Sequence, residues 1–473
     1  MANAREKRQL ALLIIGLSAV LLIAVGITCA ILILTKPQGA ATGGNTDVNN
    51  QQQQDIQQQQ QLLEEKKKEL IAQADYYALT YDYDRAMDTI RTWKDYDKDA
   101  ELVLKIKEYQ KTKDSCEKVK MSEVTHIFYH SLVVDAERAF DPSDYQGKGN
   151  YQWMTTIDEF LSITQEMYDR GYVLVSIHDL YEIVMDENGN EIMQEADIYL
   201  PKGKRAFVLS LDDLSYYHSY DGYGFASKLV LDENGKVINE YIDAEGNVHY
   251  GAYDCVPLLD QFIEEHPDAS YRGAKGTIAL TGYNGIFGYR TDYSYSLDTP
   301  GLDKDKRDFL LANPNFDVEA ERAIAKEIAE ALKASGWTFA SHTWGHLKVQ
   351  QRPLSTLMAD NEKWMLNVAS IVGETNVIIF AHGEDLGKWG NYDLSDEKVQ
   401  YYMSQGFNVF CNVDSNLYRT HFGSSGTYLR QGRRNLDGIR FYKNLIGEQD
   451  NLDDLFDVED IMDPQRPDYT VYD

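Results

Sequence analysis

The alternation of strand and helix patterns constrains the fold of this chain more than any other feature. Thr156 and Glu159 have the spacing of a capping box, and the helix that they begin is expected to end near Gly171, where an apolar strand pattern follows. The same order of strand, helix and glycine recurs around 256–280 and over 319–340. Such alternation is typical of βα units, whose strands pair in parallel. The pattern therefore predicts an α/β domain with a parallel sheet or barrel.

Glycine-containing turns interrupt this alternation between Leu229 and Tyr250. Gly235 and Gly246 each end a short polar turn, and β-like runs flank both turns. Turns of this composition join antiparallel strands. We therefore expect one or two β-hairpins inserted into the α/β domain.

Two short stretches carry the residue types of a metal site. An apolar run from Ala206 has the composition of a buried strand, and the adjacent carboxylates of Asp212 and Asp213 come where it ends. His342 and His346 are four residues apart, so on one helical turn their imidazoles would point the same way. Two imidazoles and one carboxylate leave a fourth position on a divalent metal for water, whose proton the second carboxylate can accept. Taken singly, each stretch has an alternative, because adjacent Asp residues often cap turns and His pairs at this spacing occur by chance.

The balance of charge limits the classes of partner. The 473 residues include 46 Lys and Arg against 76 Asp and Glu, which gives a formal net charge of −30. A nucleic-acid partner is not expected, because binding phosphates requires a basic surface. The four cysteines form no CxxC motif and predict no disulfide framework. The 33 tyrosines are compatible with an aromatic sugar-binding cleft and equally with packing in a core.

Residues 10–35 form an uncharged, strongly apolar segment that is long enough to span a bilayer as a helix. Basic residues precede it, so the positive-inside rule places the tail 1–9 in the cytoplasm and the main domain on the other side. The prediction is a single-pass cell-membrane protein that keeps its N-terminal helix as an anchor. A cleaved signal peptide is the alternative, although its apolar region is usually shorter and no clear cleavage site follows here.

Two segments separate this anchor from the main domain, which is expected over 121–473. Residues 36–61 are rich in Gln, Asn and Gly, so they are expected to form a flexible linker. Residues 62–120 show a helical pattern, in which 81–90 resemble the second helix of a tetratricopeptide-type hairpin. Stacked repeats generally need three copies for stability, so a helical stalk is favoured over a peptide-binding module. A protein partner at this stalk stays open.

Three motifs in the main domain occur in a characteristic order. A strand-like run ends in Tyr129-His130, the Asp pair lies in Ser210–Leu214, and a complete His-Thr-Trp-Gly-His stretch covers His342–His346. Over roughly 121–442 this order resembles the polysaccharide deacetylases, the NodB-homology family of carbohydrate esterases. The resemblance implies a distorted (β/α) barrel whose site lies at the C-terminal ends of the strands.

The resemblance also assigns roles to the motif residues. It implies that Asp212 is the general base and that the ligands of a divalent metal are Asp213, His342 and His346. Zinc is the favoured ion, although two His and one Asp also suit cobalt, nickel and iron.

Later motifs of that family are only partly matched. Its third motif corresponds to the stretch with His382 and Gly383, which lacks the usual Arg and Pro, and a backbone N–H near Gly383 would face the oxyanion. Its fourth motif resembles the stretch around Asp414, a residue expected to orient its neighbours. The His of its fifth motif has no counterpart, so His382 is the expected general acid, with His130 and His421 as open alternatives.

Further residues are expected at the edge of this site. The expected substrate-binding residues are Trp344, Gly383 and Asp414. Stacking of the Trp344 indole on a sugar ring has an equal alternative, an apolar contact within the protein. A local basic cluster is expected to pair with acidic side chains rather than hold an anionic polymer, and it consists of Arg430, Arg433 and Arg434.

These features together predict a metal-dependent hydrolase that removes acetyl groups from an N-acetylated cell-surface polysaccharide. Peptidoglycan is favoured as the glycan substrate, because the domain is expected to be tethered where a cell wall would lie. The alternative is a non-catalytic carbohydrate-binding protein that has kept the deacetylase fold. The missing fifth-motif His favours that alternative, whereas the intact Asp pair and His motif argue against it. A scaffold whose stalk recruits partners is a second alternative.

Overall fold

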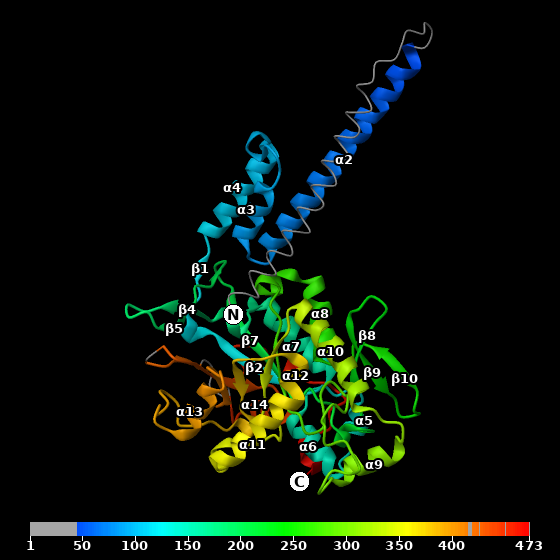
Figure 1. Cartoon of the computed structure of the whole chain (residues 1–473), viewed down its shortest axis with the longest axis vertical. Helices are drawn as coiled ribbons and strands as arrows, with labels where there is room; N and C mark the ends of the chain where they lie inside the picture. Colours follow the sequence, from blue (N-terminus) through cyan, green and yellow to red (C-terminus); the bar gives the residue numbers. More distant parts are fainter. Residues whose placement is uncertain (1–44, 415–418, 425, 450, 473) are drawn as a thin grey trace. The chain divides into compact units, whose positions relative to one another are not determined.

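The computed structural model describes residues 45–414, 419–424, 426–449 and 451–472 (Figure 1). The expected cytoplasmic tail, 1–9, and membrane anchor, 10–35, lie outside these residues. Among the helices that are described, none combines the length and the apolar character needed to cross a membrane. The chain divides into two units at Lys68, and the second unit, 69–473, holds the site.

Seven parallel strands close into a barrel. Around the barrel their order is β11, β12, β13, β14, β16, β2 and β7, and β7 pairs again with β11. Their bounds are β2 (Thr125–Tyr129), β7 (Arg205–Asp212), β11 (Thr277–Leu280), β12 (Thr338–Ser341), β13 (Val377–Ile379), β14 (Val409–Val413) and β16 (Leu429–Asn435). This closure confirms the expected α/β class and parallel barrel.

The barrel is distorted at two seams. β3 (Tyr172–Leu174) pairs with the first half of β7, and β11 pairs with its second half, so two short strands share one edge. At the other seam β12 and β13 share a single register pair, Ser341 with Ile378. Outside the closed ring, β15 (Thr420–Phe422) runs antiparallel to β16.

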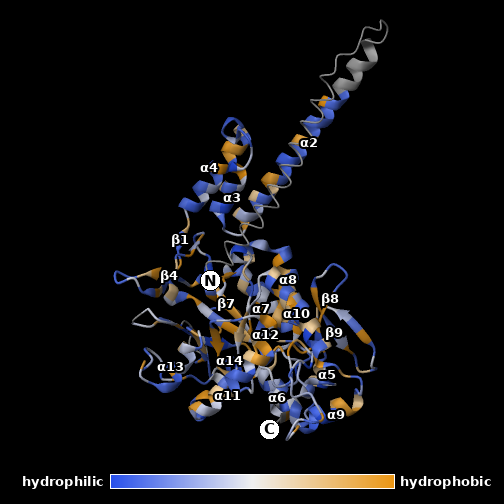
Figure 2. Ribbon diagram, in the orientation of Figure 1, coloured by the Kyte–Doolittle hydropathy of each residue, from blue (hydrophilic) through white to orange (hydrophobic). Residues whose placement is uncertain are grey.

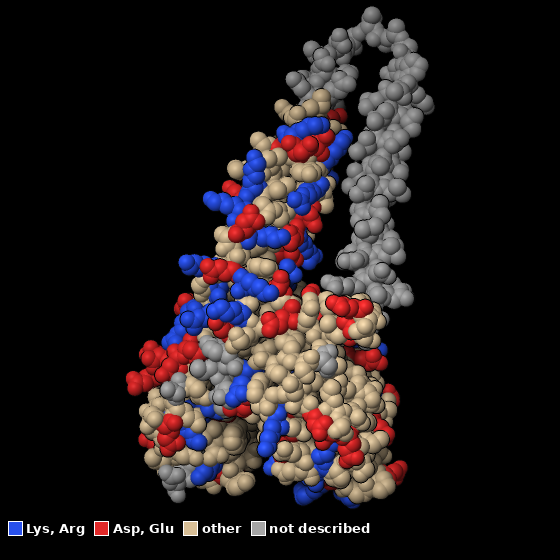
Figure 3. Space-filling model, turned by 90° about the vertical axis from the view of Figure 1, so that its left-hand side faces the viewer, with Lys and Arg blue, Asp and Glu red and all other residues tan. Residues whose placement is uncertain are grey.

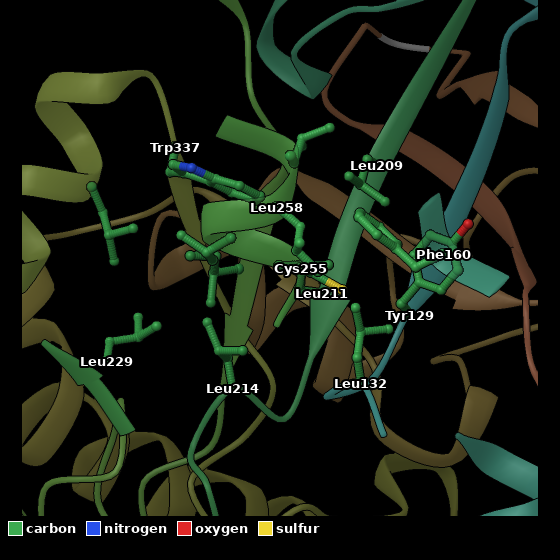
Figure 4. Close-up of a cluster of buried hydrophobic side chains, with 14 of the residues drawn as sticks. Tyr129, Leu132, Phe160, Leu209, Leu211, Leu214, Leu229, Cys255, Leu258 and Trp337 are labelled. Carbon is green, nitrogen blue, oxygen red and sulfur yellow. The ribbon is translucent and has the colours of Figure 1, made fainter. Parts of the chain in front are cut away.

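Alternation along β7 explains why the site lies at one end of the barrel. Leu209 and Leu211 pack outward against the helices, in a cluster that includes Trp337 and Leu258 (Figure 4). The intervening residue Val208 belongs to a different cluster, which includes residues of other barrel strands such as Ala279, Ala340 and Val409. Further along the same face the inward residues become polar, with Ser210 and then Asp212. The strand therefore carries its polar groups to its C-terminal end.

Helices cover the outside of the barrel. The expected helix after Thr156 is confirmed as α7, with both hydrogen bonds of the capping box present. Gly171 follows it with φ 83°, a backbone conformation that glycine adopts without strain. The α-helices of the main domain are α5 (Ala136–Ala139), α6 (Tyr145–Trp153), α7 (Ile157–Asp169), α8 (Cys255–Glu265), α9 (Lys304–Ala312), α10 (Val318–Ser335), α11 (Leu354–Trp364), α12 (Ser370–Val372), α13 (Glu397–Ser404), α14 (Gly438–Leu445) and α15 (Val458–Ile461).

Antiparallel strands are inserted between the barrel strands. The expected hairpins are found as a three-stranded sheet of β8 (Ala226–Leu231), β9 (Val237–Ile242) and β10 (Val248–Gly251). Gly235 and Gly246 occupy its two turns with positive φ, as the turn composition indicated. Two further pairs were not predicted, namely β4 (Tyr181–Met185) with β5 (Glu191–Glu195) and β1 (Glu117–Lys118) with β6 (Tyr199–Leu200). The first had a signal, because the turn ending at Gly189 has the same four residues as the turn ending at Gly235.

The N-terminal helices are α2 (Asn45–Leu79), α3 (Tyr83–Arg91) and α4 (Ala100–Asp114). Residues 45–61 lie in α2, whereas their composition led us to expect a flexible linker. Glutamine is a good helix former, and no Gly or Pro interrupts the chain between 45 and 79, so the helix can continue. The described side chains of α2 are largely hydrophilic (Figure 2). Basic and acidic residues are interspersed along these helices (Figure 3).

Within the second unit the helical hairpin packs on the barrel. Buried Ile90 and Leu102 belong to the same hydrophobic cluster as Val208 and Val409, which face the barrel interior. The Tyr81 hydroxyl donates a hydrogen bond to the Asp268 carbonyl at 2.6 Å. The cluster therefore extends across the expected boundary between 62–120 and 121–473.

Candidate metal centre

The Asp pair and the His stretch meet because β7 and β12 are both neighbours of β11. Asp212 is the last residue of β7, and the Asp213 N–H donates to the Ala279 carbonyl at 3.2 Å. His342 directly follows β12, and its N–H donates to the Leu280 carbonyl at 3.0 Å. One strand thus fixes both turns at the C-terminal end of the barrel, where parallel barrels commonly place their sites.

Three expected ligands come together at this end. The nitrogens of His342 and His346 and an oxygen of Asp213 all lie within 4.8 Å of one another. His346 Nε2 is 3.5 Å from Asp213 Oδ2, and His342 Nε2 is 3.9 Å from Asp213 Oδ1. Atoms bound at about 2.0–2.1 Å around a tetrahedral metal are roughly 3.4 Å apart, so these separations need only small adjustments. The donor set fits a divalent metal.

The tautomer of His342 suits metal binding. Its Nδ1 lies 2.7 Å from the Ile379 carbonyl, which can only accept, so Nδ1 carries the proton. Nε2 is then left with its lone pair toward the cluster. Bonds of this kind from the far nitrogen are the usual means of orienting a metal-binding imidazole.

The His stretch is a strained turn, so the expected helical turn is wrong. Thr343 and His346 have φ of 61° and 52°, and the imidazoles converge with ring centroids 5.1 Å apart. Asp360 on α11 holds the turn, because its carboxylate accepts from the N–H groups of Trp344 and Gly345, both at 2.8 Å. A short loop held by an outside carboxylate gives no local signal that separates it from a helix.

Left-handed backbone is concentrated at this centre. Nine residues other than glycine have positive φ among the described residues. Five of the nine carry the cluster or adjoin it, and these are Asp213, Tyr216, Thr343, His346 and His382. Such conformations cost energy and persist where the surrounding structure enforces them, which is most common at functional sites.

Asp212 lies beside the three ligands in a buried ion pair. Arg433 on β16 donates from Nη1 and Nη2 to its two oxygens, at 2.7 and 3.0 Å. Burial alone would raise the pKa of Asp212, but the charge of Arg433 and the hydrogen bonds that it donates outweigh burial and hold that pKa well below its usual range. Asp212 is therefore ionised at physiological pH and is the carboxylate available as a proton acceptor.

Buried polar groups extend from this ion pair into the barrel. Arg433 Nη1 also donates to Ser210 Oγ at 3.0 Å, and Ser210 Oγ lies 2.9 Å from His126 Nε2. His126 Nδ1 lies 3.0 Å from Gln431 Oε1. Burial and the Arg433 charge keep the pKa of His126 well below its usual value, so this imidazole is neutral. Its Nδ1–H donates to the glutamine, and its Nε2 accepts from the serine.

The partner of Asp212 was not identified from the sequence. The expected basic cluster does pair with acids, since Arg430 contacts Asp385 and Arg434 contacts Asp454 on the outer side of β16. Arg433 points the other way, into the barrel. The sequence does indicate which way Arg433 points. Side chains alternate between the two faces of a strand, so Gln431 and Arg433 share one face.

Two of the three candidate general acids lie at the centre. His382 is exposed, its Nε2 donates to the His346 carbonyl at 3.1 Å, and the two rings lie 4.2 Å apart. His130 Nδ1 donates to the Trp153 carbonyl at 3.1 Å, and its charge, when present, lowers the pKa of both Asp212 and Asp213. His421 instead contacts Asn391 and Trp389.

The expected substrate-binding residues have different surroundings. The Trp344 indole donates to Asp292 at 2.6 Å, and the Lys363 ammonium lies 4.2 Å from its ring centroid, so the protein itself engages this side chain. Gly383 adjoins His382 with φ 69°, and a Cβ there would lie 3.0 Å from the Val413 Cβ. Asp414 directly follows β14 and lies 3.5 Å from Arg419 Nε. Their substrate-binding roles stay predictions.

Comparison with known proteins gives matches only among solved structures. No family model matches the chain, and no curated protein matches its sequence. A deacetylase of Streptococcus pyogenes, solved with acetate, matches at 13% identity and a TM-score of 0.32, covering 68% of this chain and 94% of its own. A polysaccharide deacetylase from Bacillus cereus matches at 13% identity and a TM-score of 0.33, covering 70% and 69%.

Proposed function

We propose that this protein is a metal-dependent hydrolase that removes acetyl groups from an N-acetylated cell-surface polysaccharide, with peptidoglycan favoured. The observation that carries this proposal is the ligand set Asp213, His342 and His346, with the ionised carboxylate of Asp212 beside it. Three ligands leave a position open for water or substrate, as in catalytic rather than structural metal sites. A second carboxylate that is not itself a metal ligand is what hydrolysis requires as a proton acceptor.

Each residue of the centre has a separate role in the proposed hydrolysis. A bound divalent ion would polarise the acetyl carbonyl and lower the pKa of water. Asp212 would accept the proton of the attacking water, whose oxygen bonds to the carbonyl carbon. A protonated Asp212 would leave the Arg433 cation without its counter-charge, so this ion pair favours passing the proton onward. The bond to the sugar nitrogen then breaks, acetate is released, and the amine takes a proton.

Two histidines are candidates to supply the proton of the amine. His382 uses Nε2 to hold the His346 carbonyl, so its free nitrogen is Nδ1. His130 uses Nδ1 to hold the Trp153 carbonyl, so its free nitrogen is Nε2. We keep His382 as the proposed acid and His130 as its alternative. Replacing each by glutamine and comparing kcat distinguishes them, since only the acid has a large effect on kcat.

The location of the enzyme is also proposed. Residues 10–35 have the length and apolarity of a single membrane anchor, and the basic tail favours a cytoplasmic N-terminus. The catalytic domain would then lie outside the cell beside its wall polymer. A protein partner at 62–120 stays a prediction.

Acetate release from N-acetylated peptidoglycan by the full chain tests the proposed activity. We expect release with zinc present, and loss of release with chelator and with Asp212→Asn. Asp385→Asn is the matched control, because it removes the acid from another buried Arg–Asp pair away from the centre. Absence of release by a folded, metal-loaded protein that still binds the glycan would overturn the hydrolase and support the carbohydrate-binding alternative.

A further inference from the structure

A buried phenol contacts Asp213 Oδ1, which is the oxygen nearer to His342, whereas Oδ2 is the oxygen nearer to His346. The Tyr217 hydroxyl lies 2.6 Å from Asp213 Oδ1 and 2.5 Å from Thr281 Oγ1. Thr281 Oγ1 in turn lies 3.1 Å from Ser215 Oγ. All three hydroxyl residues are buried. The series of hydrogen bonds from Ser215 to Asp213 is therefore shielded from solvent.

Asp213, at the end of this series of hydrogen bonds, determines which group donates and which accepts in each bond. An ionised carboxylate can only accept, so the Tyr217 hydrogen is directed to Asp213 Oδ1. The remaining lone pair of Tyr217 must then accept from Thr281, and the lone pair of Thr281 from Ser215. Every hydrogen in the chain points toward the metal ligand, and successive bonds of this kind reinforce one another.

The ring of Tyr217 is fixed as firmly as its hydroxyl. It stacks on Tyr283 with centroids 5.2 Å apart and meets the edge of Tyr220 at 5.7 Å. The phenol cannot swing away from Asp213 without displacing both neighbours. Its donor and its lone pair are both used inside the protein, so it is poorly placed to bind a sugar.

We propose that Tyr217 is a positioning residue that restricts Asp213 to a single oxygen, Oδ2, for the metal, with Thr281 and Ser215 directing the phenol. Oδ2 is the oxygen that lies 3.5 Å from His346 Nε2. This inference rests on the proposed metal site but not on the proposed acetyl removal. The proposal also predicts which ion the site prefers. One oxygen with two imidazoles suits zinc, whereas manganese prefers more oxygen ligands.

Metal affinity of the full chain tests this inference directly. Dissociation constants for zinc and manganese are measured by competition with a chelator dye. We expect Tyr217→Phe to weaken zinc binding about 10- to 100-fold, as for other groups that orient a metal ligand. The affinity of Tyr217→Phe for manganese is expected to fall less, because the freed Oδ1 can bind the ion together with Oδ2. Thr281→Val is expected to weaken zinc binding less than Tyr217→Phe, and Ser215→Ala least.

Tyr220→Phe is the matched control, since it removes from the same aromatic cluster a phenol hydroxyl that donates no hydrogen bond to Asp213. Its zinc affinity should equal that of the unmodified protein. Zinc affinity of Tyr217→Phe equal to that of Tyr220→Phe would overturn the positioning role while leaving the metal site intact. Failure of the unmodified protein to bind zinc or manganese would overturn both. An unchanged zinc-to-manganese ratio, with both ions weakened alike, would overturn the single-oxygen restriction.

Discussion

Arg433 joins the proposed base to the barrel interior, and both members of its pair with Asp212 are buried. A buried ion pair is weak evidence for stability as a whole, but removing one member leaves an uncompensated charge. The guanidinium also contacts Ser210, and through it His126. At the scale of single residues, the centre therefore depends on groups well behind the ligands.

Arg433→Met is expected to lower the free energy of unfolding by about 3–5 kcal/mol, because Asp212 would stay buried without a partner. Urea unfolding of the two single variants and of the double variant with Asp212→Asn measures the coupling. The double variant should be more stable than Arg433→Met, since it carries no buried charge at this position. Equal stability of Arg433→Met and the unmodified protein would contradict this expectation.

The pH dependence of stability should include a contribution from the partly buried imidazole of His178, beside that of the fully buried His126. Burial lowers the pKa of His178 from 6.5, and its Nε2 lies 3.1 Å from Asn376 Oδ1. The unfolded chain therefore binds the proton first as the pH falls, so the stability from neutral His178 is full above about pH 6.5 and is lost below it. His178→Gln keeps a donor toward Asn376 and should flatten the loss between pH 6.5 and 5. Unfolding measured across this range with the same slope in both proteins would refute the assignment.

At the scale of elements, the contact between the helical hairpin and the barrel determines whether the two unfold together. Ile90 on α3 is fully buried in the cluster that also contains barrel residues. Leu104 on α4 is 56% exposed and provides a comparison within the same hairpin.

Ile90→Ala is expected to cost about 2–5 kcal/mol of unfolding free energy, because it leaves a cavity in a packed cluster. Leu104→Ala should change stability by no more than about 0.5 kcal/mol, as is usual for exposed positions. Urea denaturation of both variants, followed by a signal from the barrel, makes the comparison. A barrel transition unaffected by Ile90→Ala would show that the hairpin folds independently.

Elements with a strong local signal could be predicted, and those made by distant contacts could not. The capping box at Thr156 and the apolar run before Asp212 are local features, and both elements are present. The arrangement of His342 and His346 was expected for the wrong reason, since Asp360 shapes their turn from another helix. Arg433 gave no hint of its partner, because strand pairing around the barrel, far apart in sequence, brings it to Asp212.

At the scale of the whole molecule, metal binding should stabilise the second unit by mass action. A ligand at 100 times its dissociation constant raises the free energy of unfolding by about 2.7 kcal/mol when only the folded state binds it. Zinc at that concentration should therefore raise the midpoint of urea unfolding, and chelator should reverse the effect. Asp213→Asn should remove the response, whereas His421→Gln should keep it. A response that survives Asp213→Asn would place zinc elsewhere.

The packing of the hairpin on the barrel also sets an order of events during synthesis. Helices α3 and α4 leave the ribosome early, but their apolar face shares a cluster with residues as late as Leu429. β16, which carries Leu429, is also the strand that closes the ring against β2. This cluster is therefore incomplete until the residues up to Leu429 have been made. Contacts of such long range slow folding and expose chains to aggregation. The apolar cluster around the early helices is thus completed by the same strand that closes the barrel.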